Sequence, residues 1–251
     1  MIDLHSHIIP NVDDGSSSIE ETLQILYYMD TKGVKTIAAT PHYPLYNTSF
    51  FKEKIKSEIE KIKKGILKNN LELNIVLGAE IMYTERLPKL YYEDKLLTLN
   101  NTDYIFLEFR MGEEPRKLAE VVHDLKSMGL KIIIAHPERY FYVQKDHTIL
   151  YKWIEDYNLK LMLNSSSLNG SHGSQAKETA VKMLEQGLCH LMASDTHDRD
   201  NRPFTLDNGL QKAEDIRYGS KDFFNKNAES VLENKELKSL EIKREKPSLL
   251  K

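Results

Sequence analysis

Short apolar runs alternate with longer amphipathic stretches along the chain, and this alternation restricts the fold more than any other feature. The runs have strand length and lie at 2–5, 35–39, 73–78, 104–108, 131–135, 160–163 and 188–193. Helices are expected between them at 18–32, 50–69, 115–128, 147–157 and 174–186. Strands that alternate with helices favour a parallel sheet covered on both faces. Seven repeats of this unit predict an α/β fold in which the sheet closes into a barrel.

Local signals support the helix boundaries. Ser18 precedes Glu21 with the spacing of a capping box, and Gly33, Gly129 and Gly187 stand where helices would end. The second helix carries an apolar stripe of isoleucines at three- and four-residue spacing: Ile55, Ile59, Ile62 and Ile66. The remaining faces of that helix are rich in Lys and Glu, which indicates a solvated surface.

Length and charge restrict the organisation and the partners. A chain of 251 residues suits one barrel domain, so we expect a single domain over residues 1–251. The Lys- and Glu-rich tail from about residue 233 is expected to be frayed, solvated and peripheral, although its basic cluster could instead dock on a partner. The net charge of −3 gives no electrostatic case for nucleic acid or an anionic membrane, and it disfavours a nuclease.

The single cysteine and the absence of long apolar runs point to the cytoplasm. Cys189 lies in an apolar run and is expected to be a buried strand residue in a reducing compartment. No phosphate-binding loop with an arginine follows it, which excludes the cysteine-dependent phosphatases. The first residues do not form a signal peptide, and no run approaches the roughly 18 apolar residues of a transmembrane helix.

Imidazoles and carboxylates follow six of the seven expected strands. These candidate metal ligands are His5, His7, Asp14, His42, Glu80, Glu108, His136, Asp195 and His197. Only the sixth strand, which ends near Asn164, contributes no obvious ligand. The C-terminal ends of barrel strands share one rim, so residues that are distant in sequence should converge there. The sequence therefore predicts a metal site at the C-terminal rim.

The types and number of ligands predict the chemistry. Five imidazoles and four carboxylates, without a thiolate, suit Mn²⁺, Zn²⁺ or Fe²⁺. One ion rarely needs more than about six ligands, so nine imply at least two ions, and three is the better count. A site with several ions generates hydroxide near neutral pH and holds both ends of a phosphoryl displacement. Hydrolysis of a phosphate ester is the expected reaction.

Two arginines support a phosphate substrate. Arg139 and Arg202 lie in loops of the same rim, shortly after His136 and His197. A guanidinium matches phosphate oxygens and can neutralise charge in the transition state. Other histidines receive no role: His190 is expected in the core, and His172 could approach the site from its Gly- and Ser-rich loop.

These motifs resemble a known family. The segments MIDLHSHIIPNVDDG, TIAATPH, GAEI, HPER and SDTH are similar to those of the polymerase and histidinol phosphatase (PHP) superfamily. The spacing most resembles the bacterial tyrosine-protein phosphatases of the CpsB/CapC/YwqE type. The likeness runs from Met1 to about Phe204, with little to match from residue 205 onward. Where relatives often have Asp-Ala-His, this sequence has Thr196 between Asp195 and His197.

The resemblance implies a distorted (β/α)7 TIM-like barrel with three divalent ions, commonly Mn²⁺, with Fe, Zn or Mg as alternatives. The ligand sets it implies are His5, His7, Glu80 and Asp195; Glu80, Glu108 and His136; and Asp14, His42 and His197. Arg139 and Arg202 would bind phosphate. The implied substrate is phosphotyrosine on a bacterial tyrosine kinase that controls capsular or exopolysaccharide synthesis, and a ring-like homo-oligomer is also suggested.

Three hypotheses follow. In the first, a manganese-dependent tyrosine phosphatase uses a metal-bridging hydroxide, and His42 or Asp14 assists protonation of the leaving phenolate. The second keeps this chemistry with a small phosphomonoester such as histidinol phosphate. The third is a non-catalytic regulator that binds a kinase tail, against which the complete ligand set argues. The aromatic-rich loop 43–51 lies beside His42 and could contact a phosphotyrosine ring or a kinase tail, or could be packing.

Overall fold

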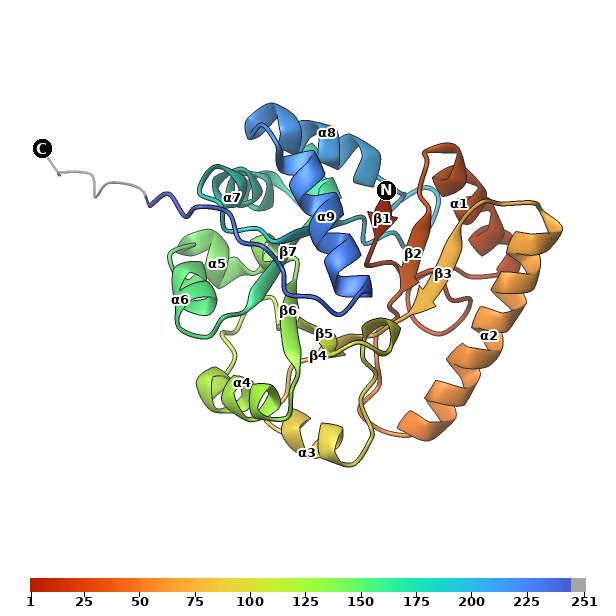
Figure 1. Ribbon diagram of the computed structural model, residues 1–251, viewed down its shortest axis with the longest axis horizontal. Coiled ribbons are helices and arrows are strands. Elements are labelled where there is room, and N and C mark those ends of the chain that lie inside the picture. Colours follow the sequence, from red (N-terminus) through yellow and green to blue (C-terminus); the bar gives the residue numbers. More distant parts are fainter. Residues whose placement is uncertain (245–251) are drawn as a thin grey trace, which may run out of the picture.

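The computed structural model describes residues 1–244 and shows parallel strands surrounded by helices (Figure 1). The strands are β1 (Ile2–Asp3), β2 (Thr36–Ala39), β3 (Asn74–Leu77), β4 (Glu80–Met82), β5 (Tyr104–Glu108), β6 (Lys131–Ala135), β7 (Lys160–Asn164) and β8 (Leu191–Ala193). One sheet has the order β1-β2-β3, and the other has the order β4-β5-β6-β7-β8. Every pairing within the two sheets is parallel, which confirms the predicted parallel α/β architecture.

Two isolated parallel bridges join the sheets into a distorted barrel. Ser6 pairs with Thr196 beyond the ends of β1 and β8, and His42 pairs with Glu80 beyond the end of β2. The backbone nitrogen of His7 also donates to the carbonyl of Thr196 at 2.7 Å. The barrel is therefore closed mainly at its C-terminal rim, where the candidate ligands lie.

The expected third strand is longer than predicted and bends in the middle. β3 pairs with β2, whereas β4, which follows after two residues, pairs with β5. The bend passes close to other side chains, because a Cβ added at Gly78 would lie 2.5 Å from Leu99 Cδ1 and 3.0 Å from Thr40 Cγ2. Together β3 and β4 occupy one barrel position, so the fold retains seven βα positions.

The helices surround the barrel (Figure 1). The five expected helices are present as α1 (Ile19–Thr31), α2 (Thr48–Lys68), α4 (Leu118–Ser127), α6 (Ile149–Glu155) and α7 (Ser174–Glu185). Ser18 caps α1 by accepting from the backbone nitrogen of Glu21, as predicted. The isoleucine stripe of α2 is buried. Helices that sequence patterns did not identify are α3 (Leu87–Tyr92), α5 (Phe141–Lys145), α8 (Leu206–Ile216) and α9 (Ser220–Leu232).

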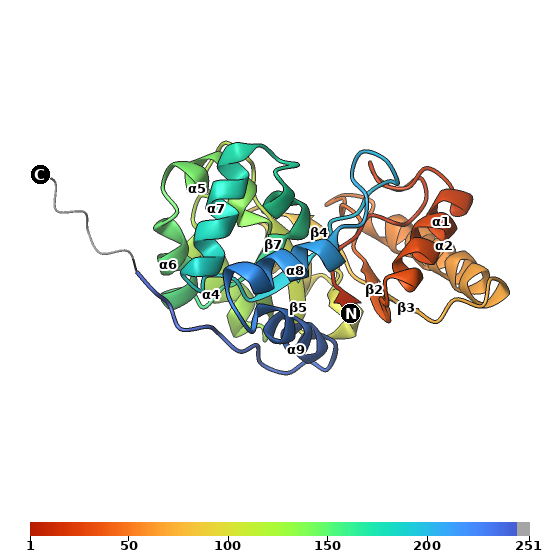
Figure 2. The ribbon, with the colours of Figure 1, turned by 90° about the horizontal axis from the view of Figure 1, so that it is seen from above.

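The C-terminal part of the chain closes the end of the barrel opposite the candidate site. Inside the barrel, Tyr104 and Phe106 pack in one cluster with Ala228 and Val231 of α9 and with Leu237 beyond it. In the side view, α9 lies at the lower edge and the loop between β8 and α8 lies at the upper edge (Figure 2). The interior of a barrel is a packed core, so this end requires apolar cover.

The expectation that the tail is frayed from about residue 233 is therefore wrong for residues 233–244, although most of them are exposed to solvent, as expected. Leu237 is buried, and the Tyr104 hydroxyl donates to the carbonyl of Lys235 at 2.6 Å. The backbone nitrogen of Lys243 donates to the carbonyl of Gln186 at 2.9 Å. The last residues of the predicted tail, 245–251, lie outside the described part of the chain. Among residues 1–244, no helix has the length and apolar character needed to span a bilayer.

Candidate metal centre

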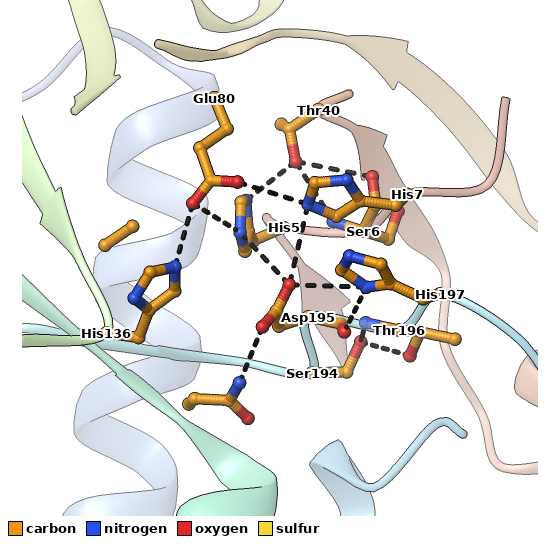
Figure 3. A network of polar contacts seen from close by, with 12 residues as sticks. His5, Ser6, His7, Thr40, Glu80, His136, Ser194, Asp195, Thr196 and His197 are labelled. Atoms are coloured by element: carbon orange, nitrogen blue, oxygen red, sulfur yellow. Dashed lines mark hydrogen bonds and ion pairs between the residues drawn. The ribbon is translucent and has the colours of Figure 1, made fainter. Parts of the chain in front are cut away.

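The structure brings all nine candidate ligands together at the C-terminal rim. Their side chains come from the segments after β1, β2, β6 and β8, from the start of β4 and from the end of β5. Figure 3 shows six of them: His5, His7, Glu80, His136, Asp195 and His197. They form four overlapping groups, within each of which one ligand atom per residue lies within 4.8 Å of the others. The groups are His7, Asp14, His42 and His197; His5, His7 and Glu80; His5, His136 and Asp195; and His42, Glu80 and Glu108.

These groups overlap with the ligand sets implied by the family resemblance but differ in several memberships. His136 and Asp195 form a group with His5, apart from the other residues of their implied sets. His7 joins the group around Asp14 and His197, in addition to the group with His5. His42 joins the Glu80 and Glu108 group. Some imidazoles thus lie between two neighbouring candidate ion positions. The rings of His7 and His197 are stacked, with their centroids 3.8 Å apart.

Hydrogen bonds on one side of three imidazoles aim the other nitrogen into the cluster. His5 Nδ1 lies 2.7 Å from Thr40 Oγ1, and His7 Nδ1 lies 2.7 Å from Asp13 Oδ2. His197 Nδ1 lies 2.9 Å from the Asp195 carbonyl, and it must donate there because a carbonyl only accepts. Nε2 of each ring is buried without a hydrogen-bond partner among residues 1–244. A bonded Nδ1 with a free Nε2 is how proteins orient histidine for a metal, so these residues fit an ion.

Glu80 contacts four imidazoles of the cluster, and Figure 3 shows three of these contacts, to His136, His5 and His7. Its Oε1 lies 2.9 Å from His136 Nε2 and 3.3 Å from His5 Nε2. Its Oε2 lies 3.1 Å from His42 Nδ1 and 3.3 Å from His7 Nε2. Each carboxylate oxygen therefore faces a different pair of imidazoles, which is the geometry expected of a carboxylate shared by two ions.

The charges of the cluster also favour cations. Burial would raise the pKa of Glu80, but the charge of His5 and hydrogen bonds from His136 and His42 outweigh it and hold that pKa well below its usual value. Burial, together with the nearby charge of Glu80, raises the pKa of Glu108 to about 7. Two close carboxylates disfavour each other's ionised form. A divalent ion between them would remove this repulsion.

Asp195 connects the cluster to both predicted arginines. Its Oδ1 lies 3.4 Å from His5 Nε2. Its Oδ2 accepts from Arg139 at 3.0 Å, from Arg202 at 2.7 Å and from Asn164 Nδ2 at 2.8 Å. One oxygen thus faces the imidazoles while the other holds two guanidiniums beside them. The arginine side chains retain 19% and 29% exposure, so an anion can reach them.

A polar cleft of about 310 Å³ opens beside these arginines. Its walls include Arg139, Arg202, Ser166 and His172. His172 therefore approaches the site, as its loop allowed, and its Nε2 lies 2.9 Å from Ser166 Oγ. Burial and the charge of Arg139 lower the pKa of His172 to about 4, so this ring is neutral near pH 7. His190, in contrast, is a core residue with hydrogen bonds at both ring nitrogens, as predicted.

His42 and Asp14 form the open side of the centre. Their side chains are 43% and 60% exposed, and His42 Nε2 lies 3.5 Å from Asp14 Oδ1. Asp14 Oδ2 lies 3.5 Å from Arg202 Nη1. These two residues therefore lie between the buried imidazoles and solvent.

Several positioning residues were missed by the sequence interpretation. Asp13 orients His7, and it also accepts from the backbone nitrogen of His42 at 2.9 Å. Asn164, at the end of the strand without a ligand, holds Asp195. The DDG run contains the signal for Asp13, because Gly15 allows a tight turn: a Cβ there would lie 1.9 Å from the His7 carbonyl oxygen. Nothing in the local sequence indicates Asn164.

Two candidate ligands adopt left-handed backbone conformations. The φ angles are 35° at His136, the first residue after β6, and 55° at Asp195, the second residue after β8. Such angles cost of order 1–3 kcal/mol for residues other than glycine and persist where the surroundings impose them. The turn at each position directs the side chain into the cluster instead of continuing the strand. Cys189 is buried, as predicted, but it precedes β8 and does not lie within a strand.

Comparison with known proteins places the chain in a family. The model for "Capsular polysaccharide synthesis, CpsB/CapC" matches residues 1–233. The match continues well past Phe204 and includes α8 and α9. The likeness predicted from the motifs, which ended at about Phe204, was therefore too short.

Curated relatives and a solved structure agree with that match. The chain is 33% identical to a "putative tyrosine-protein phosphatase CapC" of Staphylococcus aureus over 206 residues, which cover 82% of this chain and 80% of the relative. It is 30% identical to "tyrosine-protein phosphatase YwqE" of Bacillus subtilis over 239 residues, which cover 93% and 92%.

A solved structure in a study of YwqE from Bacillus subtilis and CpsB from Streptococcus pneumoniae, described as metal-dependent tyrosine phosphatases, superimposes with a TM-score of 0.90. The two share 28% identity, and the match covers 98% of this chain and 100% of that chain. The agreement of the family model, the relatives and the fold shows that the chain belongs to the CpsB/CapC family of capsular polysaccharide synthesis.

Proposed function

We propose that this chain is a manganese-dependent protein-tyrosine phosphatase that hydrolyses phosphotyrosine at the centre formed by the nine residues. The observation that carries the proposal is the position of Asp195. This carboxylate faces the imidazole cluster with one oxygen and holds Arg139 and Arg202 with the other. A phosphate bound by the guanidiniums would therefore lie directly beside the candidate metal ligands.

The proposed role of the arginines is to bind and orient the phosphate. Each guanidinium uses one hydrogen bond for Asp195 Oδ2 and has further N–H groups for phosphate oxygens. Because the buried carboxylate of Asp195 bonds to both arginines, the two guanidinium groups are held in position before the substrate binds. Such preorganised donors stabilise the charge of the transition state.

The buried side of the centre would hold three divalent ions. When bound, these ions lower the pKa of water and neutralise charge on the phosphate oxygens. Asp13 and Thr40 keep the Nε2 atoms of His7 and His5 aimed at the cluster. Imidazole and carboxylate ligands without thiolate suit Mn²⁺, with Fe, Zn or Mg as alternatives.

At the open side, His42 or Asp14 would assist protonation of the leaving phenolate oxygen. Both side chains are accessible, and they lie 3.5 Å apart. A phenolate is a good leaving group and needs little help, so this contribution should be smaller than that of the arginines.

The names of the relatives support the substrate and the pathway. Two relatives are named tyrosine-protein phosphatases, and the family is described by capsular polysaccharide synthesis. We therefore propose that the substrate is phosphotyrosine in the C-terminal tail of a bacterial tyrosine kinase that regulates capsular or exopolysaccharide synthesis. Such a tail is phosphorylated from ATP, which places the reaction in the cytoplasm. Self-association remains a prediction of the family resemblance.

Hydrolysis of p-nitrophenyl phosphate with and without metal tests the chemistry. EDTA should abolish activity, Mn²⁺ should restore it, and His136→Ala should remove it. Full activity in EDTA would contradict the proposal.

The substrate class needs a separate measurement. A phosphotyrosyl peptide and histidinol phosphate should be compared as substrates across several metals. Preferential turnover of the phosphotyrosyl peptide is expected, and preferential turnover of histidinol phosphate would favour the small-molecule phosphomonoesterase. A Glu108→Gln variant that loses hydrolysis but still functions in cells would favour the non-catalytic regulator.

A further inference from the structure

A second cleft, of about 640 Å³, adjoins the open side of the metal centre. Asp14 and His42 line it on the side of the cluster. Val12 and Asp13 add to the lining from the loop after β1. The other lining residues belong to the segment between β2 and α2 and to the first turn of α2, and they include the aromatic residues Tyr43, Tyr46 and Phe50. The cleft is therefore continuous with the candidate site and has an aromatic character that the polar cleft beside the arginines lacks.

The aromatic side chains of this cleft divide into a buried floor and an exposed rim. Tyr43 and Phe51 are 4% and 9% exposed and contact each other edge to face, with ring centroids 5.5 Å apart. Tyr46 and Phe50 are 76% and 71% exposed. The two buried rings therefore pack against the core, which is one of the two roles that the sequence left open for this loop. The two exposed rings, which form the rim of this cleft, are not part of that packing, so their position must have another reason.

Exposed aromatic rings beside a catalytic centre are suited to bind a flat apolar group. Aromatic rings pair favourably with other rings in addition to the apolar area that they bury. Contact of two such rings with water has an unfavourable free energy. Because both rings lie at the mouth of the site, a bound substrate could cover them. The Tyr43 hydroxyl adds a buried polar atom on the floor without a hydrogen-bond partner within residues 1–244.

Asp14 lies between Arg202 and the aromatic cleft, and its position therefore indicates how a substrate would be oriented. Asp14 lies 3.5 Å from Arg202 on one side and 3.5 Å from His42 on the other. A phosphoryl group at the arginines and a ring in the aromatic cleft would therefore lie on either side of the same carboxylate. In an aryl phosphate, a single ester oxygen separates phosphorus from the ring, so the ring must bind next to the phosphate, on the side where Asp14 and His42 border the aromatic cleft.

We propose that Tyr46 and Phe50 form the subsite that receives the aromatic ring of the phosphotyrosine substrate and that they determine the preference for aryl over alkyl phosphates. This inference rests on the proposed function, because it assigns the substrate's ring to a surface of the same site.

Inhibition by two non-hydrolysable phosphonates tests the subsite apart from leaving-group chemistry. Benzylphosphonate and propylphosphonate carry the same head group, but only the first has a ring. The inhibition constants should be measured with full-length protein supplied with Mn²⁺. Tyr46→Ala and Phe50→Ala should each weaken benzylphosphonate by about fivefold to tenfold, the size of one aromatic contact, and change propylphosphonate by less than about twofold.

Matched variants separate the subsite from general effects. Tyr46→Phe keeps the ring and should retain wild-type selectivity. Tyr218→Ala removes a ring that is 95% exposed before α9 and should leave both constants unchanged. Phe141, which is 64% exposed and lines a separate cleft together with Arg139, is the competing ring. Phe141→Ala should not reduce selectivity for benzylphosphonate.

Several outcomes would overturn the inference. These are equal weakening of both phosphonates by the rim variants, unchanged selectivity in those variants, or loss of selectivity in Phe141→Ala. A change in the oligomeric state of the rim variants without a change in selectivity would indicate that the rim contacts a second copy of the chain. If the wild-type protein hydrolyses phosphotyrosyl peptides while the rim variants retain selectivity, only the inference fails. If the wild-type protein does not hydrolyse such peptides, the proposed function fails.

Discussion

Arg202 Nη2 lies 2.7 Å from Asp195 Oδ2, the same oxygen that Arg139 approaches at 3.0 Å. Asp195 therefore links Arg202, in the loop between β8 and α8, to the candidate metal cluster, because Oδ1 of the same carboxylate faces His5 and His7. A residue proposed to bind phosphate is thus positioned by a residue proposed to bind metal. Perturbing either one tests the connection.

Arg202→Ala should lower kcat/KM for a phosphotyrosyl peptide by about 10²–10³-fold, because one preorganised donor to the developing charge is lost. Arg202→Lys should not restore activity, since an ammonium cannot reproduce the planar fork. Arg199→Ala is the control, because Arg199 lies in the same loop but bonds to Gln24 at the surface. Steady-state kinetics measures all three variants. Equal losses in Arg199→Ala would show that loop conformation is responsible.

Asp13→Asn should weaken Mn²⁺ binding by roughly 10–100-fold, since removal of the carboxylate that orients a metal-binding histidine has effects of this size. The carboxylate lies 2.7 Å from His7 Nδ1. Mn²⁺ affinity can be measured by competition with a chelator, which does not depend on catalysis. Glu20→Gln, at an exposed position of α1, provides the control. Unchanged affinity in Asp13→Asn would remove the proposed orienting role.

Leu237→Ala should lower the free energy of unfolding by roughly 2–3 kcal/mol, because it leaves a cavity beneath the barrel. Leu237 packs with Tyr104 and Phe106 inside the barrel. Its neighbour Glu236 has only a surface ion pair with Lys131 at 3.1 Å, so Glu236→Ala should cost less than about 1 kcal/mol. Urea unfolding gives both values. Similar stability of the two variants would contradict a structural role for residues 233–244.

His190 should make folding stability fall as the pH falls. Burial, with a smaller effect from Lys160, lowers its pKa to about 3. The unfolded chain therefore takes up a proton below about pH 6.5 while the folded protein does not, and stability present above that pH is lost progressively toward pH 3.

His190→Gln removes this titration and should give a flatter dependence of unfolding free energy on pH between about 6.5 and 4. The difference between the wild-type protein and the variant isolates His190 from other titrating groups. Urea unfolding at pH 7, 6 and 5 measures it, and parallel curves would show that His190 does not contribute.

The strands and the candidate ligands could be predicted because their signals are local. In six of the seven expected strands, an apolar run of four to six residues ends in, or is soon followed by, a His, Asp or Glu. The parallel topology then brings those residues to one rim. β4 was missed because it has only three residues and follows a bend at Gly78. That bend depends on the approach of Leu99, which is distant in sequence.

The C-terminal part of the fold could not be predicted for a related reason. Residues 233–244 have the polar composition of a solvated tail, and only Leu237 fills the end of the barrel. The need for that cover arises from the tertiary structure, since the barrel interior would otherwise be open at this end. Asn164 was likewise missed because its contact with Asp195 joins residues 31 positions apart.

The central claim is that the nine residues form a metal centre that hydrolyses phosphotyrosine. The most direct test is to strip the wild-type protein of metal and add Mn²⁺ in measured equivalents, with hydrolysis of a phosphotyrosyl peptide and bound metal per chain followed together. We expect no hydrolysis before addition, saturation near three ions per chain, and loss of both bound metal and hydrolysis in His136→Ala. Full hydrolysis by the stripped protein, or by His136→Ala, would contradict the account.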